Sequence, residues 1–181
     1  MTTETIAMNK SKEIRLSKVT LNIGAGTTTE GVDKAVTLLE TISGMKAVKA
    51  KARRRIANFN IRPGLPIGAI VTLRGEKARE ILQRLLKSVE NKIKEESFTQ
   101  NGFSFGIKEY IDIPSVKYDP KIGVIGLHVN VSLERCGYRV KRRKIRNMRI
   151  GTKHEISGKE CADWAQKELG IIFKVEEEQQ W

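Results

Sequence analysis

The chain has 181 residues, of which 39% are hydrophobic and 30% are charged, and its formal net charge is +13. A chain of this length buries roughly 70% of its unfolded surface in one core, so we expect a single domain over 13–173. Its composition excludes a wholly disordered protein, and no apolar run approaches the ~20 residues that a membrane-spanning helix needs.

The first ten residues and the two cysteines indicate the cellular compartment. The N-terminal sequence lacks the apolar core and the cleavage site of a signal peptide. Cys136 and Cys161 have neither metal-ligand spacing nor the density of a disulfide-rich secreted protein. We therefore predict a cytoplasmic protein whose thiols are small packing groups that bind no metal.

The excess positive charge is confined to two acid-free segments. Residues 41–75 contain eight Lys and Arg, residues 135–154 contain nine, and the rest of the chain has 17 basic and 21 acidic residues. Two basic patches on a mildly acidic body favour phosphate neutralisation, and hence nucleic acid, over a general solubility device. Neither segment has the amphipathic helical face that binds a membrane surface, so no membrane partner is expected.

The first part of the chain predicts a strand, a helix and a second strand. Alternating apolar residues indicate a strand over 14–23, which Gly24-Ala25-Gly26 breaks. Apolar residues at helical spacing predict a helix over 31–43, and Gly44 ends it. A short strand over 46–51 is expected to follow.

Residues 51–66 are the most basic stretch of the first half of the chain. They combine a KARRR run with Pro63, Gly64 and Pro66 and have no helical period, which predicts a long loop without secondary structure. A loop of this length is usually functional or disordered. Its cations and Phe59 suit contact with RNA, although a single aromatic residue of this kind more often packs under its own loop.

The middle of the chain predicts two further strands around a helix. Apolar residues alternate along 67–74, and the strongest apolar stripe in the chain predicts a helix over 76–94. Asn101-Gly102 marks the turn of an inserted hairpin over 98–113. Residues 124–133 then alternate between apolar and polar, as a half-buried strand does.

The order strand, helix, strand, strand, helix, strand is that of the α+β ferredoxin-like split βαβ sandwich. In such a sandwich the helices cover one face of an antiparallel sheet and leave the other face open. The outward-facing residues of the predicted strands would share the open face, and they are polar: Thr20, Asn22, Thr72, Arg74, His128 and Asn130. A hydrogen-bonding, cationic face without aromatic residues suits the sugar-phosphate surface of structured RNA.

The last part of the chain predicts an extended segment, a helix and a short strand. Residues 135–154 have no stable apolar period and are expected to leave the body as an extended basic segment. Ser157-Gly158-Lys159-Glu160 matches a capping box that opens a helix ending at Leu169, and 171–173 is a candidate edge strand. We expect a mobile arm at 1–12 and an acidic tail at 174–181.

Two features that could indicate an enzyme are better explained without one. Gly24, Gly26 and Gly31 lack the third glycine of a dinucleotide motif and the Lys-Ser/Thr pair of a phosphate-binding loop, so a turn is favoured. His128 and His154 have no carboxylate or cysteine at ligand spacing. No nucleophile, base and orienting group occur together, so we predict that the chain is not an enzyme and needs no cofactor.

Three long stretches resemble one known family. They are VTLNIGAG (19–26), SGMKAVKAKARRRIANFNIRPGLPIGAIVTLRGEKA (43–78) and NGFSFGIKEYIDIP with YDPKIGVIGLHVNVSLE (101–134). Together they resemble the family of ribosomal protein five of the large subunit, over nearly the whole of 13–173. The run from GYRVKRRK to IGTKHEIS is similar to the archaeal and eukaryotic branch of that family.

The resemblance implies a non-enzymatic, ribosome-bound protein of the cytoplasm. It implies that the open sheet face binds 5S rRNA in the central protuberance, beside large-subunit rRNA. The loop at 53–66 is expected to reach the tRNA in the peptidyl site, and the outer edge to contact a small-subunit bridge protein. The family often has Gln where Met45 stands, and a thioether cannot donate two hydrogen bonds, so that contact would be lost or taken over by Lys46.

Two sets of residues follow as candidates for contact with RNA. Those expected to contact rRNA are Thr20, Asn22, Lys46, Lys49, Phe59, Thr72, Arg74, His128, Asn130, Arg139, Lys141, Arg142 and Arg143. Those of the tRNA-contacting loop are Arg53, Arg54, Arg55, Ile56, Asn58, Asn60 and Arg62.

Two other functions remain open at this point. One is a nucleotide-binding enzyme of the same fold, with 24–31 as a phosphate turn, which would show a saturable site for ATP or NAD. The other is a free RNA chaperone, which would not sediment with large ribosomal subunits.

Overall fold

A computed structural model describes residues 10–174 of the chain. Of the predicted mobile arm at 1–12, only a short 3₁₀ helix at Lys10–Lys12 lies within the described residues. Of the predicted acidic tail at 174–181, only residue 174 does. No helix within 10–174 is long and apolar enough to cross a membrane.

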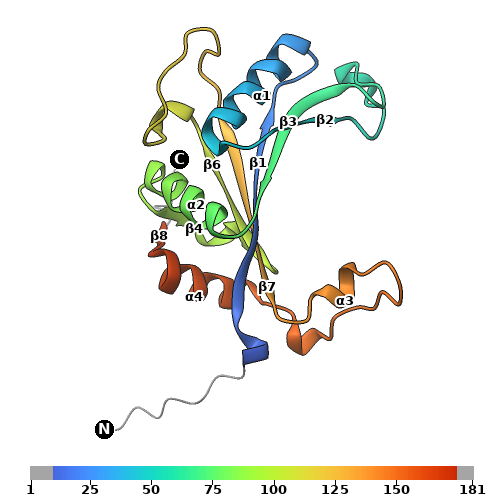
Figure 1. Cartoon of the computed structure of the whole chain (residues 1–181), viewed down its shortest axis with the longest axis vertical. Helices are drawn as coiled ribbons and strands as arrows, with labels where there is room; N and C mark the ends of the chain where they lie inside the picture. Colours follow the sequence, from blue (N-terminus) through green and yellow to red (C-terminus); the bar gives the residue numbers. More distant parts are fainter. Residues whose placement is uncertain (1–9, 175–181) are drawn as a thin grey trace, which may run out of the picture.

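The centre of the structure is a six-stranded antiparallel sheet with the strand order β2-β3-β1-β7-β6-β5 (Figure 1). Its strands are β1 (Ile14–Gly24), β2 (Val48–Lys51), β3 (Pro66–Leu73), β5 (Phe98–Thr99), β6 (Gly102–Ile107) and β7 (Leu127–Arg135). The four strands β2, β3, β1 and β7 have the antiparallel order of the split βαβ sandwich. The predicted α+β fold class is therefore confirmed.

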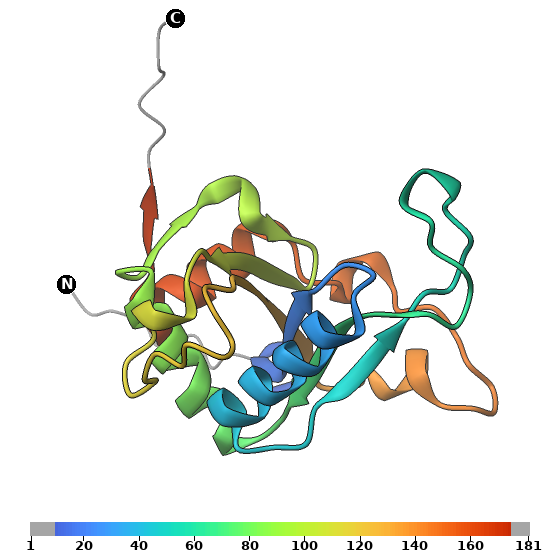
Figure 2. The same ribbon diagram turned by 90° about the horizontal axis from the view of Figure 1, so that it is seen from above.

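The helices α1 (Thr29–Ser43), α2 (Glu76–Ser88) and α4 (Gly158–Leu169) lie on the same side of this sheet (Figures 1 and 2). Each presents a stripe of buried residues, such as Leu38 and Leu39 on α1 and Leu82 and Leu85 on α2. These stripes pack with the inward-facing strand residues into one hydrophobic core. Gly44 ends α1 in the left-handed conformation, at φ 61°, as its position predicts.

The helix predicted over 76–94 is six residues too long. It ends at Ser88, because Glu90 and Asn91 take left-handed backbone angles of φ 54° and 56° that turn the chain away from the helix axis. Residues Lys92–Lys94 then form strand β4, which pairs in parallel with β8 (Ile172–Lys174). The predicted C-terminal edge strand therefore exists, but it belongs to this separate two-stranded sheet.

The predicted hairpin over 98–113 is part of the main sheet. Strand β6 pairs with β7 along its whole length and places Phe103, Phe105 and Ile107 in the core. Asn101 makes the turn before β6 with φ 64°, as the Asn-Gly signal indicated. The strand predicted over 124–133 starts later, at Leu127, because residues 108–126 form the connection after β6.

The segment 135–154, which we call the second basic segment, is not simply extended. Helix α3 (Arg139–Arg142) and a 3₁₀ turn at Thr152–His154 interrupt it. The segment begins at a buried arginine, because the side chain of Arg135 is only 7% exposed. Arg135 was counted among the nine basic residues expected to neutralise phosphates, but its buried side chain is not available for that role.

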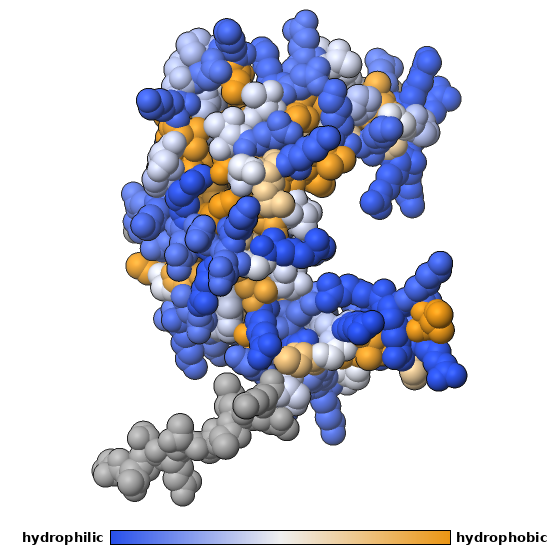
Figure 3. Space-filling view, in the orientation of Figure 1, coloured by the Kyte–Doolittle hydropathy of each residue, from blue (hydrophilic) through white to orange (hydrophobic). Residues whose placement is uncertain are grey.

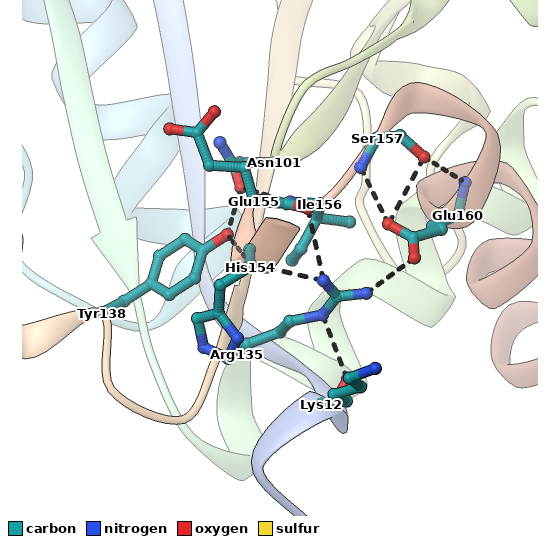
Figure 4. Close-up of polar contacts among 9 residues, drawn as sticks. All are labelled: Lys12, Asn101, Arg135, Tyr138, His154, Glu155, Ile156, Ser157 and Glu160. Atoms are coloured by element: carbon teal, nitrogen blue, oxygen red, sulfur yellow. Dashed lines mark hydrogen bonds and ion pairs between the residues drawn. The ribbon is translucent and has the colours of Figure 1, made fainter. Parts of the chain in front are cut away.

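Arg135 holds three parts of the chain together (Figure 4). Its Nε donates to the carbonyl of Lys12 at 3.1 Å, and its Nη1 donates to the carbonyls of His154 and Glu155 at 3.3 and 3.2 Å. Its Nη2 donates to Glu160 Oε1 at 2.8 Å. The guanidinium therefore ties the start of β1 and the end of the second basic segment to α4.

Glu160 has a second structural role at the start of α4. Its Oε2 accepts from the backbone N–H of Ser157 at 3.0 Å, and its own N–H donates to Ser157 Oγ at 3.3 Å. This is the predicted capping box, and it is confirmed. The hydrogen bond from the Ser157 backbone has the largest effect on the pKa of Glu160 and lowers it. Burial opposes this effect, and the hydrogen bond and charge of Arg135 add to the lowering.

We predict that Arg135→Met lowers the free energy of unfolding by about 3 kcal/mol, because buried carbonyls and a carboxylate lose a charged donor. Arg142→Met is the matched control, since the side chain of Arg142 is 56% exposed and pairs with Glu134 at the surface. That variant should stay within about 1 kcal/mol of the wild type. Urea unfolding measures both values, and equal losses would contradict a structural role for Arg135.

The lowered pKa of Glu160 predicts a pH effect on stability. A carboxylate whose pKa is lower in the folded state stabilises the fold above its unfolded pKa, and that contribution is lost as the pH falls through the folded value. The free energy of unfolding should therefore decline less steeply from pH 5 to pH 3 in Glu160→Gln than in the wild type. Glu96→Gln, at an exposed position, is the control. Unfolding curves at several pH values that decline in parallel for all three proteins would refute this.

Candidate nucleic-acid interface

The face of the sheet opposite the helices carries rows of polar side chains. Cross-strand pairing aligns Thr72, Thr20, Asn130 and Ser104 in one row across β3, β1, β7 and β6. The next row contains Ile70, Asn22, His128 and Gly106. Because side chains alternate along each strand, these residues face away from the buried set that includes Val19 and Leu21. The predicted open polar face is therefore present.

The polar side chains of this face are available to a ligand. Ser104, His128 and Asn130 are exposed, and Thr20, Asn22 and Thr72 are half-buried. None of these six side chains hydrogen-bonds to another residue of the described chain. Arg74 is exposed directly after β3. Four neighbouring strands thus present free donors and acceptors, with no Phe, Tyr or Trp among the residues of these two rows, which suits ribose and phosphate groups.

Residues 51–66, which we call the basic arm, project from one end of the sheet. The prediction of a loop without secondary structure is wrong, because Ile56 and Ile61 pair as an antiparallel bridge around a 3₁₀ turn at Ala57–Phe59. Closer to the sheet, the N–H of Ala52 donates to the carbonyl of Leu65 at 2.8 Å. These bonds continue the β2–β3 pairing outward, so the arm is a two-stranded ribbon with backbone pairing rather than an irregular loop.

The arm exposes the residues predicted to contact tRNA, together with Phe59. Seven predicted contact residues of the arm are all exposed: Arg53, Arg54, Arg55, Ile56, Asn58, Asn60 and Arg62. Phe59 lies at the tip and is 68% exposed, so it does not pack under its own loop. An exposed aromatic ring among arginines is a suitable stacking partner for a base.

The second basic segment folds back on itself at the opposite end of the sheet. Arg143 Nε donates to the carbonyl of Arg146 at 2.7 Å, and the N–H of Met148 donates to the carbonyl of Val140 at 3.4 Å. These contacts close a compact turn that exposes Arg139, Lys141, Arg142 and Arg143. His154 takes part in the fold rather than in an exposed site, since its Nε2 lies 2.9 Å from the carbonyl oxygen of Cys136.

Two of the predicted cations are already paired with acidic side chains. Lys49 Nζ lies 2.5 Å from Asp33 Oδ1, and Arg142 Nη2 lies 2.5 Å from Glu134 Oε2. Both pairs are at the surface, where such contacts contribute little stability and can be exchanged for a phosphate. Lys46, in contrast, is exposed just before β2 without an ion pair among residues 10–174.

The two cationic projections flank a recess (Figure 3). In that view the basic arm extends at the upper right and the second basic segment at the lower right, with the sheet between them (Figures 1 and 3). The pairing explains this placement, because Gly24 at one end of β1 lies opposite Gly68 beside the arm, and Ile14 at the other end lies opposite Arg135. The concave surface is therefore polar at its back and cationic at both ends.

Sequence reasoning missed part of this interface. Ser104 lies in the same row as Thr20 and Asn130, yet it was not predicted, because the hairpin was treated as an insertion outside the sheet. The signal was present in the alternation of Phe103, Phe105 and Ile107, which requires residues 104 and 106 to face the other way. The strand partner of β6 was the missing information.

The glycine turn at 24–26 connects β1 to α1 without the features of a nucleotide site. Thr28 precedes α1 and its side chain makes no capping hydrogen bond. A Cβ at Gly31 would lie 3.1 Å from the carbonyl oxygen of Ala25, so this glycine permits close packing of the helix on its own turn. The preference for a chain-reversing turn over a phosphate loop agrees with this geometry.

Comparison with known proteins identifies the family. A model described as "Ribosomal protein L5" matches residues 9–62, and a second model, which describes the C-terminus of the same ribosomal family, matches residues 66–168. A protein named "Large ribosomal subunit protein uL5" from Nanoarchaeum equitans is 55% identical over 161 residues, which cover 88% of this chain and 95% of that protein.

Two further archaeal relatives carry the same name. The protein from Sulfurisphaera tokodaii is 44% identical over 88% of this chain and 90% of its own length, and that from Archaeoglobus fulgidus is 43% identical over 92% and 93%. All three are named as ribosomal proteins, so the prediction that the chain is not an enzyme is confirmed. The chain belongs to the ribosomal protein L5 family, as the resemblance of its motifs implied.

Proposed function

We propose that this chain binds 5S rRNA and attaches it to the large ribosomal subunit in the central protuberance. The observation that supports this most is the uncovered row Thr72, Thr20, Asn130 and Ser104, which lies between two cationic projections. The row supplies uncharged hydrogen-bonding groups that set the register of an RNA strand. The projections neutralise phosphates on either side of it.

The basic arm has a different partner in this proposal. It extends the β2–β3 pairing beyond the body of the protein, so its tip, with Asn58 and Asn60, can reach a second molecule. We assign that molecule to the tRNA in the peptidyl site. The outer edge of the protein contacts neighbouring ribosomal proteins, including a bridge protein of the small subunit, and the protein acts on cytoplasmic ribosomes.

Variants of the polar row and variants of the cationic projections should affect binding to 5S rRNA in different ways. Asn130→Ala removes an uncharged hydrogen-bonding group, so the affinity should fall about fivefold to tenfold while the salt slope is unchanged. Arg139→Ala should weaken binding and reduce the slope of log K against log salt by about one. Lys34→Ala on the outer face of α1 is the control and should change neither quantity. Filter binding at several salt concentrations measures both, and wild-type binding that is independent of salt would end the proposal.

Variants of the basic arm should impair tRNA retention, and variants of the second basic segment should impair 5S rRNA binding. In ribosomes that carry the double variant Arg54→Ala/Arg55→Ala, retention of peptidyl-site tRNA should fall severalfold, because two phosphate contacts are lost. The same variant should bind isolated 5S rRNA more tightly than Arg139→Ala does. Arg139→Ala should show the reverse pattern, weak 5S rRNA binding with normal tRNA retention in assembled ribosomes. Loss of 5S rRNA binding alone in the arm variant would reassign the arm to rRNA.

A further inference from the structure

A hollow of about 610 Å³ lies on the open face where the ends of β1, β6 and β7 meet. Its border includes Asn22, Gly24, Gly106, Lys108, Gly126 and His128, and the core residues Ile107 and Leu127 complete it. Its volume is in the range of sites that hold small organic groups. The border contains no carboxylate, which distinguishes it from a site for a cation.

Glycine keeps the hollow open at the end of β1. Gly24 follows Asn22 by two residues and so faces the same side of the sheet. Apart from Gly24 and its two chain neighbours, no atom of the described residues lies within 4 Å of the position that a Cβ at Gly24 would take. Its φ is not in the left-handed region, so neither packing nor backbone strain requires glycine here. Glycine at this position leaves space on the open face, and no close contact with another described residue requires it.

The other two glycines have separate roles. A Cβ at Gly126 would lie 2.7 Å from the carbonyl oxygen of Lys108, so this glycine is needed for the close approach of two backbone segments. A Cβ at Gly106 would lie 3.6 Å from Nδ1 of His128. The imidazole of His128 therefore lies close to β6, next to the position that a side chain at residue 106 would occupy.

Three side chains around the hollow have complementary chemistry. Asn22 and His128 are directly paired across β1 and β7, which places their Cβ atoms about 5 Å apart. Neither side chain hydrogen-bonds to another of the described residues. The amide of Asn22 both donates and accepts, the imidazole of His128 offers an aromatic face, and the exposed Lys108 adds a cation at the rim.

We propose that the hollow receives a single unstacked base of the RNA bound on the open face. Asn22 hydrogen-bonds to the edge of that base, the ring of His128 stacks against it, and Lys108 contacts its phosphate. Bases that are splayed out of loops and bulges are recognised in this way, by stacking on an aromatic ring and by hydrogen bonds to their edges. The inference rests on the proposed binding of 5S rRNA and adds a base-specific contact to it.

Filling the hollow tests this proposal. Gly24→Leu places an apolar side chain in the hollow at a position where no described atom obstructs it. The affinity for 5S rRNA should fall about tenfold or more, because the stacked base and its hydrogen bonds are excluded. Thr37→Leu, on the exposed face of α1, is the matched control and should bind like the wild type. Wild-type affinity in Gly24→Leu would overturn the proposal.

Chemical probing of the RNA supplies a second readout. Dimethyl sulfate and a carbodiimide together report the reactivity of all four unpaired bases. One loop or bulge base should be protected in the wild-type complex and reactive in saturated complexes of Gly24→Leu and of His128→Ala, while the remaining footprint is unchanged. His128→Ala keeps the test valid if Gly24→Leu does not fold. A footprint that is identical in all complexes would overturn the inference and leave 5S rRNA binding intact, whereas no binding by the wild type would refute the proposed function itself.

Discussion

The structure depends on a sheet that is apolar on one face only. Val19, Leu21 and Ile23 face the helices and are fully buried, whereas Thr20 and Asn22 face the other way. The helices can gain apolar burial on the first face alone, so all of the long helices gather there (Figure 1). The opposite face stays uncovered because a helix placed on it would bury polar groups without partners. The proposed RNA interface is therefore a direct consequence of how the core forms.

Antiparallel register turns this open face into an ordered surface. A hydrogen-bonded ladder fixes which residues stand side by side, so Thr72, Thr20, Asn130 and Ser104 form a row although they come from four distant parts of the sequence. The basic arm connects β2 to β3 at one end of the sheet, and the second basic segment follows β7 at the other end, which keeps their charges apart. Arg135, buried at the base of the second basic segment, uses its charge for the fold, while exposed cations beyond it, such as Arg139 and Lys141, are available to phosphates.

Two kinds of arginine therefore occur in one basic run, and they act through different physics. An exposed arginine attracts phosphate over a distance that salt shortens. A buried arginine must satisfy its donors locally, as Arg135 does with the carbonyls of Lys12, His154 and Glu155. Residues of one type also differ in role around the hollow: packing requires a glycine at Gly126 but not at Gly24.

The sequence by itself determined the features that depend on neighbours in the chain. These are the alternation of 14–23 and of 124–133, the helical stripes, the Gly44 stop, the capping box at Ser157 and the clustering of charge, although the second of these strands begins only at Leu127. The tertiary structure alone decided that β6 joins the main sheet, that Ser104 enters the polar row, that Arg135 is buried and that the basic arm is a paired ribbon. Local periodicity is set by the geometry of one element, but the choice of partner depends on contacts between residues far apart in sequence, which no single segment encodes.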